Sequence, residues 1–533
     1  MFTKKSHIKS ISSVVAAAIA LSGCALQSDY VKPKVATEQN WSGKKEIAVD
    51  AKQIPTQSKW WLVLDDSAIN ELIDATYANN PTLDQAVARI DEARAQLGIN
   101  KADYLPNVTV QGGVTRAKSG GVSGTTVATS QNTTASIGPQ LSWELDLFGR
   151  VRSSVDVAEN RLDARTADAE NTKLVLGSQV ANTVLDLRAC QNSAKVYTNE
   201  ISSRQKTLDL VRVKLNAGFV APVEEANTQR DLSAAQVKLA SQKEVCERNV
   251  NALVALSGKN RDEVLKSIAP LVSDNNAEAY MPTPPDAMPE LPAKVLMSHP
   301  SIIAADRDAA AAWSDIGVAK ADQYPRVDLA ALFTGQWIRA AGSTINFTSW
   351  SIGPNIVGTL FDGGKLSSAV DASEARYRQE AANLQSVVRT TVEEVENALA
   401  AQKSTNDRVV FAKQSADAAK IAFTATEEGW KGGISSLLEL EDSRRQLAIA
   451  QDSVISAARD NAKAWVGLVS ATGNAITNIE PVEKETSATK ATEVKSIEMK
   501  KEPSIETPKK EEIKSTEKPT IKVIKNDNAT NIN

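Results

Sequence analysis

The sequence is poor in histidine and aromatic residues and has no hydrophobic run of membrane-spanning length. Only His7 and His299 occur among its 533 residues, which removes most metal-binding and catalytic-triad chemistry. No stretch approaches the roughly 20 apolar residues of a transmembrane helix, and the net charge of −4 carries no nucleic-acid signature. An aromatic content of 5% is low for a compact enzyme and typical of long helices packed through Ala, Leu and Val. We therefore expect no enzyme, cofactor, metal site or nucleic-acid partner.

The start of the chain indicates a lipoprotein signal peptide, residues 1–23. Lysines precede an apolar run over residues 11–21, which is too short to cross a bilayer as a helix. The run ends in Leu-Ser-Gly-Cys24, which resembles the bacterial lipobox, where cleavage leaves the cysteine at the new N-terminus to be lipidated. The alternative is a plain signal peptide with a chance cysteine. We expect Cys24 to carry acyl chains, and Ala25 in place of Asp resembles sequences sorted to the outer membrane.

Composition sets three further segments apart. Residues 24–80 are expected to form an N-terminal periplasmic segment that begins at the lipidated cysteine. A Pro-rich stretch within 261–298 indicates a linker or equatorial region. Residues 476–533 consist mainly of Lys, Glu, Thr and Pro, with no aromatic residue after 480. Such a segment cannot bury enough apolar surface to offset its ordering entropy, so we expect a disordered tail.

The remainder of the chain consists of two similar halves. Asn80-Pro81 opens the first half and His299-Pro300 opens the second, at a shift of 219 in the numbering (299 − 80). Further along the shift settles at 215 and carries Ile137-Gly138-Pro139 onto Ile352-Gly353-Pro354. A register held over this length indicates an internal duplication. Each half is predicted to contain a helix, a strand pair and a hairpin of long helices, which makes the chain an α+β protein. The predicted halves are residues 81–260 and 299–475.

Two segments in each half alternate between apolar and polar residues with period two. Across residues 135–145 the odd positions are Ala, Ile, Pro, Leu, Trp and Leu, while the even positions are mainly polar. A strand with one apolar face packs on a core in a sandwich or faces lipid in a barrel. Polar loops over 117–132 and 339–346 favour the barrel. The predicted strand pairs are 106–116 with 133–146, and 325–337 with 348–361.

Four strands are too few to close a membrane barrel, because the smallest single-chain membrane barrels have about eight. An open sheet edge in hydrocarbon leaves backbone groups unpaired, each at a cost of several kcal/mol. We therefore expect a homotrimer with a barrel of about twelve strands. Trp143, Trp337 and Trp350 are expected near strand ends as an aromatic girdle against outer-membrane lipids, although a Trp stripe taken alone is more often plain core.

Long helices are predicted to carry most of the mass. Residues 151–216 contain no proline and would extend roughly 100 Å at 1.5 Å per residue. The run breaks at Ala217-Gly218, and a second helix returns to about residue 257. The second half repeats this pattern around Gly432-Gly433. Such hairpins are too thin to form a globular domain, so they must pack on copies of themselves. The predicted hairpins cover residues 150–258 and 365–473.

Together these features resemble the outer membrane factors of tripartite efflux pumps, the TolC-like family, and specifically its OprM/NodT-like lipoprotein branch. The resemblance covers about residues 24–478 and depends on the lipobox, the paired helix hairpins and four short motifs. It implies a trimer with a twelve-strand barrel in the outer membrane, continued by a twelve-helix tunnel in the periplasm. The motifs are Trp60-Trp61, Tyr104-Leu-Pro106, Leu145-Asp-Leu-Phe-Gly-Arg150 and Leu360-Phe-Asp-Gly-Gly-Lys365.

The resemblance also implies a function. The trimer would be a passive exit duct for drugs or other small molecules, with an inner-membrane transporter supplying energy and a periplasmic adaptor joining the two. An alternative is a coiled-coil structural or adhesive lipoprotein without a pore, which has no use for strand pairs joined by small polar loops. A third is a glycosidase using paired carboxylates, which is disfavoured because the carboxylates lie on regular helices among Lys and Arg.

Cys190 and Cys246 are expected to form a disulfide. The first hairpin turns near Gly218, and the two cysteines lie equally far before and after it (218 − 190 = 246 − 218 = 28). In an antiparallel helix pair, equal distances from the turn bring two positions level, and the periplasm is oxidising. The alternative is a pair of buried free thiols, because sequence does not fix the rotation of each helix.

A gate is expected at the periplasmic tip, in a segment after Gly433 that resembles the family's constriction. The resemblance implies an apolar ring from Leu438 and acidic rings from Glu439 and Asp442, with Glu224 as the first-half counterpart of Glu439. Three copies would bring six carboxylates from these two rings toward one axis. Glu441 stands where the family has an apolar residue, so the register is fixed only to within one residue. The alternative is a solvated face of Glu439, Glu441 and Asp442 that pairs with Arg444 and Arg445.

Overall fold

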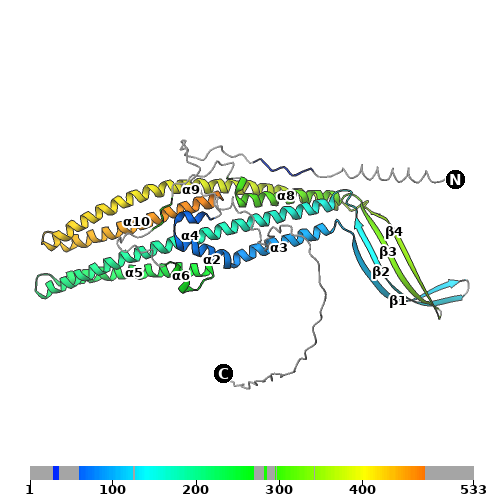
Figure 1. The fold of residues 1–533 in the computed structure, drawn as a ribbon, viewed down its shortest axis with the longest axis horizontal. Coiled ribbons are helices and arrows are strands. Elements are labelled where there is room, and N and C mark those ends of the chain that lie inside the picture. The colour runs from blue at the N-terminus through cyan, green and yellow to red at the C-terminus, as the bar shows by residue number, and fades with distance from the viewer. Residues whose placement is uncertain are drawn as a thin grey trace, which may run out of the picture. The chain divides into compact units, whose positions relative to one another are not determined.

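The computed structural model describes residues 28–34, 59–123, 126–268, 281–284, 295, 297–340 and 342–473. The chain divides into two units, residues 1–479 and 480–533, and every described residue belongs to the first. The expected signal peptide, the lipidation site at Cys24 and the tail from 476 lie outside the described residues. Within the first unit, long helices run side by side, and a four-stranded sheet extends from one end of them (Figure 1).

The two halves contain helices of matching length. Their short first helices have 22 residues each, the long outgoing helices 67, and the returning helices 36. The outgoing and returning helices therefore form hairpins close to the predicted ranges 150–258 and 365–473. The first half contains α3 (Pro81–Ala102), α4 (Arg150–Asn216) and α5 (Pro222–Ser257); the second contains α8 (Pro300–Ala321), α9 (Lys365–Lys431) and α10 (Leu437–Thr472).

Local stereochemistry explains where these helices begin and turn. Asn80 and His299 cap α3 and α8 ahead of a proline whose fixed φ suits the first helical turn. Gly218 and Gly433 have φ of 79° and 76° and occupy the two hairpin turns, where a side chain would be strained. In the motif that leads from sheet to helix, the Asp146 carboxylate accepts hydrogen bonds from the first backbone N–H groups of α4. These caps satisfy donors that a helix start leaves open.

The sheet has the order β1-β2-β3-β4 and is antiparallel throughout. Its hairpins are longer than predicted, since pairing continues from Ala117↔Asn132 to Ser123↔Thr126 in a segment expected to be a loop. The 339–346 segment is likewise mostly strand, and the last strand ends at Val357 rather than 361. Ladder hydrogen bonds satisfy the backbone of Ser- and Thr-rich segments as well as that of apolar ones, so polarity did not mark the strand ends. The strands are β1 (Asn107–Ser123), β2 (Thr126–Glu144), β3 (Arg326–Ala340) and β4 (Ser343–Val357).

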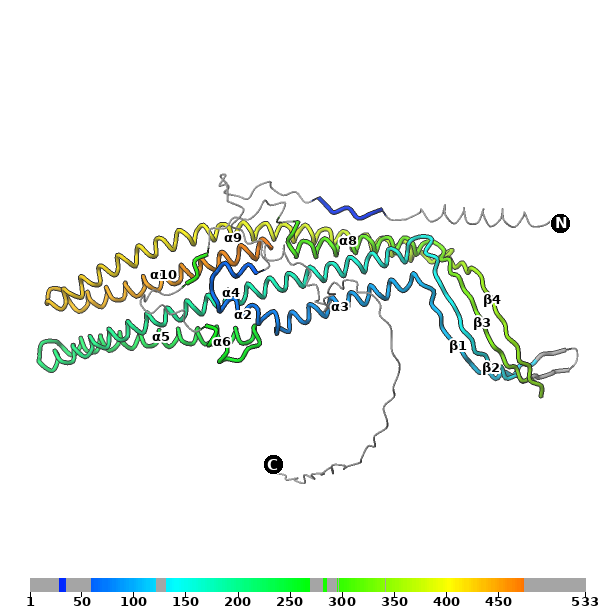
Figure 2. The backbone as a smooth tube through the Cα atoms, in the orientation of Figure 1, coloured from blue at the N-terminus to red at the C-terminus, as the bar shows by residue number. Residues whose placement is uncertain are grey.

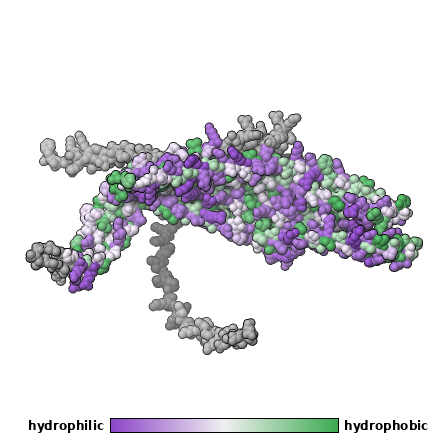
Figure 3. Space-filling view, turned by 180° about the vertical axis from the view of Figure 1, so that it is seen from behind, coloured by the Kyte–Doolittle hydropathy of each residue, from purple (hydrophilic) through white to green (hydrophobic). Residues whose placement is uncertain are grey.

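Strand register brings the predicted apolar faces of all four strands to one side of the sheet, while Leu332, Ile338, Ile345 and Phe347 lie on the other. Val108 lies opposite Leu141, Leu141 opposite Ala331, and Ala331 opposite Ile352. Directly opposed residues point to the same face, so the predicted alternation is continuous across the sheet. The large side chains on this face remain exposed in the single chain; Trp350, for example, is 74% exposed. Figure 3 shows hydrophobic and hydrophilic colour interspersed along the sheet.

A compact core joins the hairpins at mid-length. It contains Trp60 and Trp61 of a short 3-10 helix, η2 (Trp60–Leu64), packed with α2 (Ser67–Asn79), α4, α5 and Trp465 of α10. The indole of Trp60 lies 6.1 Å from that of Trp465 between ring centroids. Helix α6 (Arg261–Ser267) also belongs to this core through Val264. Residues 261–267 begin the segment expected to be a linker or equatorial region, and a capping box at Asn260 and an apolar face fold this turn onto the core.

His299 is expected to make the stability of this region dependent on pH. Its buried Nδ1 accepts a hydrogen bond from the backbone N–H of Ser301 at 3.3 Å and so caps α8. Burial lowers the pKa of His299 below its ordinary 6.5, partly opposed by a hydrogen bond from the ring to the backbone of Ser470. The stabilisation is complete above pH 6.5 and is lost as the pH falls through 6.5 toward the folded pKa, because protonation charges a buried ring and removes the cap acceptor.

We expect the thermal unfolding midpoint of the wild type to fall more between about pH 7.5 and 5.5 than that of His299→Asn. Asparagine is the chosen replacement because the first half of the chain has Asn80 at the equivalent position. The Asn80 side chain caps α3 by accepting from Thr82 N at 2.9 Å. Equal pH dependence in the two proteins would contradict a role for this imidazole.

Candidate functional site

Both hairpin turns lie at the end of the helices that is remote from the sheet (Figure 2). Each exposes large apolar side chains, with Phe219 80% and Ile434 89% exposed. Val223 and Leu438, in the first turn of each returning helix, are exposed as well. Figure 3 shows hydrophobic colour at this tip and mainly hydrophilic colour along the middle of the helices. A water-exposed apolar patch of this kind is typical of an interaction surface.

The first turns of α10 divide into two faces. Leu438, Glu439 and Asp442 are exposed, whereas Leu440 and Glu441 are buried. Glu439 forms a capping box, in which its carboxylate accepts from Ser436 N at 2.7 Å and its own N–H donates to Ser436 Oγ. Asp442 forms an exposed ion pair with Arg445. The three predicted gate residues on α10 therefore share the face that no other described part of this chain buries.

Glu224 occupies the equivalent first turn of α5 and is half-buried. Its neighbour Glu225 pairs with Arg212 of α4 at 2.9 Å. Glu224 also contributes its backbone carbonyl, which accepts from the Thr228 hydroxyl at 2.8 Å. Glu224 thus lies near the tip of the first hairpin. Its position along α5 corresponds to the position of Glu439 along α10.

Glu441 belongs to a buried ion cluster between α4 and α10. Its carboxylate accepts from Arg204 Nη1 at 2.5 Å and also pairs with Arg444, and the side chains of all three are nearly inaccessible. Arg444 donates in addition to the Thr207 hydroxyl at 3.2 Å. The alternative of a solvated face thus fails for Glu441, although Asp442 does pair with Arg445. Arg204 lies 237 residues from Glu441, so no local pattern indicated this contact.

The structure joins Cys190 and Cys246 by a disulfide between α4 and α5, with a Cα–Cα distance of 5.6 Å. This is the bond that their equal distances from the turn predicted. A crosslink over 56 residues constrains the unfolded chain, and here it ties the two helices of the first hairpin together near mid-length.

The three candidate girdle tryptophans lie at different levels of the sheet. Trp143 is next to the helix-side end of β2 and donates its indole N–H to Tyr104 O at 3.0 Å. Trp337 lies three residues before the far end of β3. Trp350 lies opposite Phe333 in the middle of β4, so the expectation that it is near a strand end is wrong. Alternation alone defines which face of the sheet a side chain occupies. Its position along the strand direction is known only once the strand register is known.

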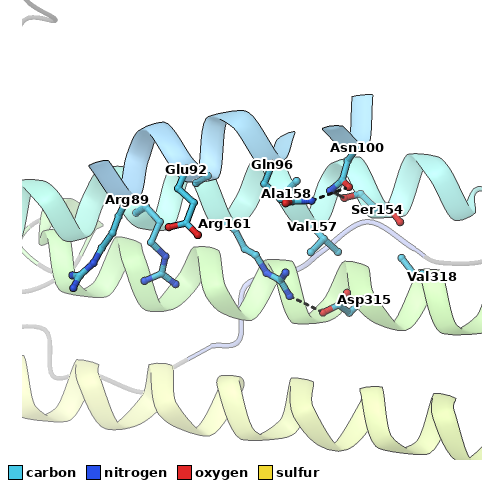
Figure 4. A pocket seen from close by; sticks show the side chains of 12 residues that line it. Arg89, Glu92, Gln96, Asn100, Ser154, Val157, Ala158, Arg161, Asp315 and Val318 are labelled. Atoms are coloured by element: carbon cyan, nitrogen blue, oxygen red, sulfur yellow. Dashed lines mark hydrogen bonds and ion pairs between the residues drawn. The ribbon is translucent and has the colours of Figure 1, made fainter. Parts of the chain in front are cut away.

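A groove of about 650 Å³ runs between α3, α4 and α8 (Figure 4). Its lining is charged, with Arg89 and Glu92 from α3, Arg161 from α4 and Asp315 from α8. Arg161 and Asp315 form an ion pair at 3.2 Å across the groove. Burial raises the pKa of Asp315, and the positive charge of Arg161 opposes this shift. Because its charges are largely paired and the groove is open to solvent, it has the character of a packing surface between helices.

Two features are absent from the described part of the chain. In these ranges, no group of three or more His, Cys, Asp or Glu side chains is placed to hold a metal ion. Among the same residues, no helix combines the length and apolarity needed to cross a membrane.

Comparison with known proteins identifies the family. The model of the outer membrane efflux protein family matches residues 72–259 and 291–474, which are most of the two halves. The chain therefore belongs to the outer membrane efflux protein family. Its members are channel proteins, which favours an efflux channel of the outer membrane over the pore-less coiled-coil alternative.

Individual relatives cover most of this chain. Nodulation protein T of Rhizobium leguminosarum bv. trifolii is 28% identical over 455 residues, which are 85% of this chain and 95% of the relative. The probable efflux pump outer membrane protein TtgC of Pseudomonas putida is 27% identical over 473 residues, 87% of this chain and 95% of its own. Among solved structures, the outer-membrane channel OprN aligns with a TM-score of 0.73 at 24% identity, covering 85% of this chain and 99% of that one. The Campylobacter jejuni CmeC channel aligns with a TM-score of 0.72 at 21% identity, covering 85% and 95%. These structures share the fold.

Proposed function

We propose that three copies of this chain form a closed outer-membrane duct with a barrel of twelve strands and a tunnel of twelve helices. The uncovered apolar face of the sheet carries this proposal. Water does not tolerate a continuous apolar face of this size, whereas lipid does. Strands β1 and β4 are the edges of the sheet, and an edge in hydrocarbon must be paired. Pairing β4 of one copy with β1 of the next closes the sheet after three copies.

The helices extend the same ring. Each chain contributes two outgoing and two returning long helices, and α4 and α9 would each extend about 100 Å at 1.5 Å per residue. Matching helix lengths and two separate family matches support an origin of the halves by duplication. Six similar units around one axis then produce a tunnel that is nearly uniform along its circumference.

We further propose that the chain is anchored through acylated Cys24, with its helices in the periplasm. The described segment 28–34 lies along α8, where Trp313 donates its indole N–H to Ser28 O at 2.8 Å and Tyr30 donates to Asp306. Cys24 precedes Ser28 by four positions, which allows a reach of about 14 Å. Trp313 is eight positions before the sheet-side end of α8, about 12 Å along the helix. An acyl chain on Cys24 is thus within reach of the inner leaflet beside the barrel.

The tip supports a gate and a docking site. Leu438, Glu439 and Asp442 line the exposed face of α10 and would form one apolar and two acidic rings around the axis. Glu224 would add a further carboxylate per copy at the same level. The exposed apolar turns with Phe219 and Ile434 would receive a periplasmic adaptor, which connects the duct to an inner-membrane transporter. The transported molecules would be drugs or other small compounds, and the duct itself would supply no energy.

Reconstitution in planar bilayers tests this function. Purified full-length protein is expected to be a cross-linkable trimer in mild detergent and to conduct ions in discrete steps. A monomer that produces no conductance, at protein concentrations where a related channel conducts, would instead support the pore-less lipoprotein.

A further inference from the structure

The two halves of the chain are equivalent position by position, including their contacts. The short helices α3 and α8 begin at Pro81 and Pro300, a shift of 219, and α4 and α9 begin at Arg150 and Lys365, a shift of 215. Lys101 of α3 and Glu159 of α4 form an ion pair at 2.7 Å. The shifts map these residues onto Lys320 of α8 and Glu374 of α9, which form an ion pair at 4.0 Å. The strand pair Val108↔Leu141 likewise falls on Val327↔Ile356. The shifts therefore predict contacts as well as sequence.

One seam inside the chain joins the first half to the second. Helix α8 packs against α4 on one side and against α9 of its own half on the other. Across the α4–α8 seam, Arg165 Nη2 lies 3.1 Å from Asp308 Oδ1, and Arg161 Nη2 lies 3.2 Å from Asp315 Oδ2. Figure 4 shows the second of these pairs bridging the two helices. In a closed ring, the second half must meet the first half of another copy through an equivalent seam, formed by α9 and α3.

The equivalent of the Arg165–Asp308 pair has its charges reversed. The equivalent of Arg165 is Glu380 on α9 (165 + 215 = 380). The equivalent of Asp308 is Arg89 on α3 (308 − 219 = 89). The described residues of the chain offer neither Glu380 nor Arg89 an ion-pair partner. The other pair, Arg161–Asp315, falls on Arg376 and Gln96, which are suited to a hydrogen bond.

Charges of both signs surround the two reversed residues within their own chain. Arg89 lines the groove together with Arg161, Arg165 and the carboxylates of Glu92 and Asp315. Arg161 and Arg165 are already paired with Asp315 and Asp308. Burial raises the pKa of Asp308, the positive charge of Arg165 opposes this shift, and the negative charge of Glu380 adds to it. Glu380 thus lies close enough to Asp308 to be repelled by it, and an opposite charge from another copy would offset this repulsion.

We propose that Glu380 of one copy pairs with Arg89 of the next copy. The proposal rests on the trimer proposed above and specifies its helical seam. Within the chain, α8 is already packed between α4 and α9, and α4 is packed against α3 and α8. The second half therefore meets the next copy through α9, and the first half through α3.

The strands support the same seam. Within the chain, Leu141 of β2 lies opposite Ala331 of β3. The same shifts place Ile356 of β4 opposite Gly112 of β1 in the next copy. Ile356 and Gly112 both belong to the apolar face, so the predicted register continues this face across the seam without a break.

Charge reversal tests the pair. Arg89→Glu and Glu380→Arg are each expected to lower the trimer fraction of the full-length protein in detergent, and the double variant Arg89→Glu/Glu380→Arg is expected to restore it. Arg94→Glu is the matched control, since it makes the same charge change on the same helix. Arg94 is exposed, and its equivalent Trp313 packs on Tyr377 of α9 rather than on α4. The control is expected to assemble like the wild type.

Cysteine substitution tests the contact directly. Arg89→Cys/Glu380→Cys is expected to yield disulfide-linked dimers and trimers on oxidation, whereas Arg94→Cys/Glu380→Cys is expected to remain uncrosslinked. A wild-type trimer whose single reversals assemble normally and whose Arg89→Cys/Glu380→Cys variant does not crosslink would overturn the seam but leave the trimer standing. A wild type that is monomeric in detergent and in outer membranes would overturn both.

Discussion

Replacing Leu438, Glu439 and Asp442 together by alanine is expected to raise single-channel conductance several-fold and to reduce cation selectivity. The three side chains share the exposed face of α10 near its first turn, so their removal leaves neither a cavity nor a buried charge. In a trimer it would remove one apolar ring, which resists wetting when narrow, and six carboxylates that attract cations. The measurement is conductance and reversal potential in planar bilayers under a salt gradient.

A matched control separates the gate from helix capping. Glu439 also completes the capping box with Ser436, so Glu439→Ala shortens or frays the start of α10 as well as removing a charge. Ser436→Ala disrupts the same cap and keeps all the carboxylates. We expect it to conduct like the wild type. Conductance and selectivity that stay at wild-type values in the triple variant would place the constriction elsewhere.

The second large effect is expected from Asp66→Ala. Asp66 is 0% exposed, accepts from Ala68 N at 2.9 Å to cap α2, and pairs with Arg188 of α4 through two contacts of 3.1 Å. The guanidinium also donates to the Ile268 carbonyl, so one ion pair connects α2, α4 and the end of α6. Removing the carboxylate breaks the buried ion pair by deleting one partner, which destabilises by about 3–5 kcal/mol.

The readout is the thermal unfolding midpoint of the detergent-solubilised protein, which we expect to fall by several degrees. Asp74→Ala is the control, because Asp74 pairs with Lys59 at 2.9 Å with both side chains about half exposed. Exposed pairs of this kind contribute about 0–1 kcal/mol, so this midpoint should move little. Equal shifts in the two variants would show that the buried pair has no special role in the core.

The ion cluster of Glu441 has a structural role that differs from the role proposed for the neighbouring gate residues. It holds α10 against α4 and so links the second hairpin to the first near the tip. Burial lowers the pKa of Arg444, while the negative charge of Glu441 opposes this shift. Glu441 therefore lies at the contact between the two hairpins, away from the exposed face of α10 that carries Leu438, Glu439 and Asp442.

Features that depend on neighbouring residues could be predicted from the sequence. Proline and glycine positions defined where the long helices begin and turn, because they restrict or release φ locally. The two-residue period defined which strand face is apolar, and equal spacing from Gly218 brought Cys190 and Cys246 level. Each of these follows from repeated geometry along one element or one hairpin.

The burial of individual charges and the full length of the strands emerged only in the folded chain. Asp66 and Arg188 are 122 residues apart in sequence, and Arg204 and Glu441 are 237 apart. Whether such residues meet depends on the rotation of each helix about its axis, and a charged residue has the same appearance in sequence whether it faces water or another helix. The Ser/Thr-rich ends of β1 and β2 were likewise hidden, because backbone hydrogen bonds that extend a ladder do not depend on side-chain polarity.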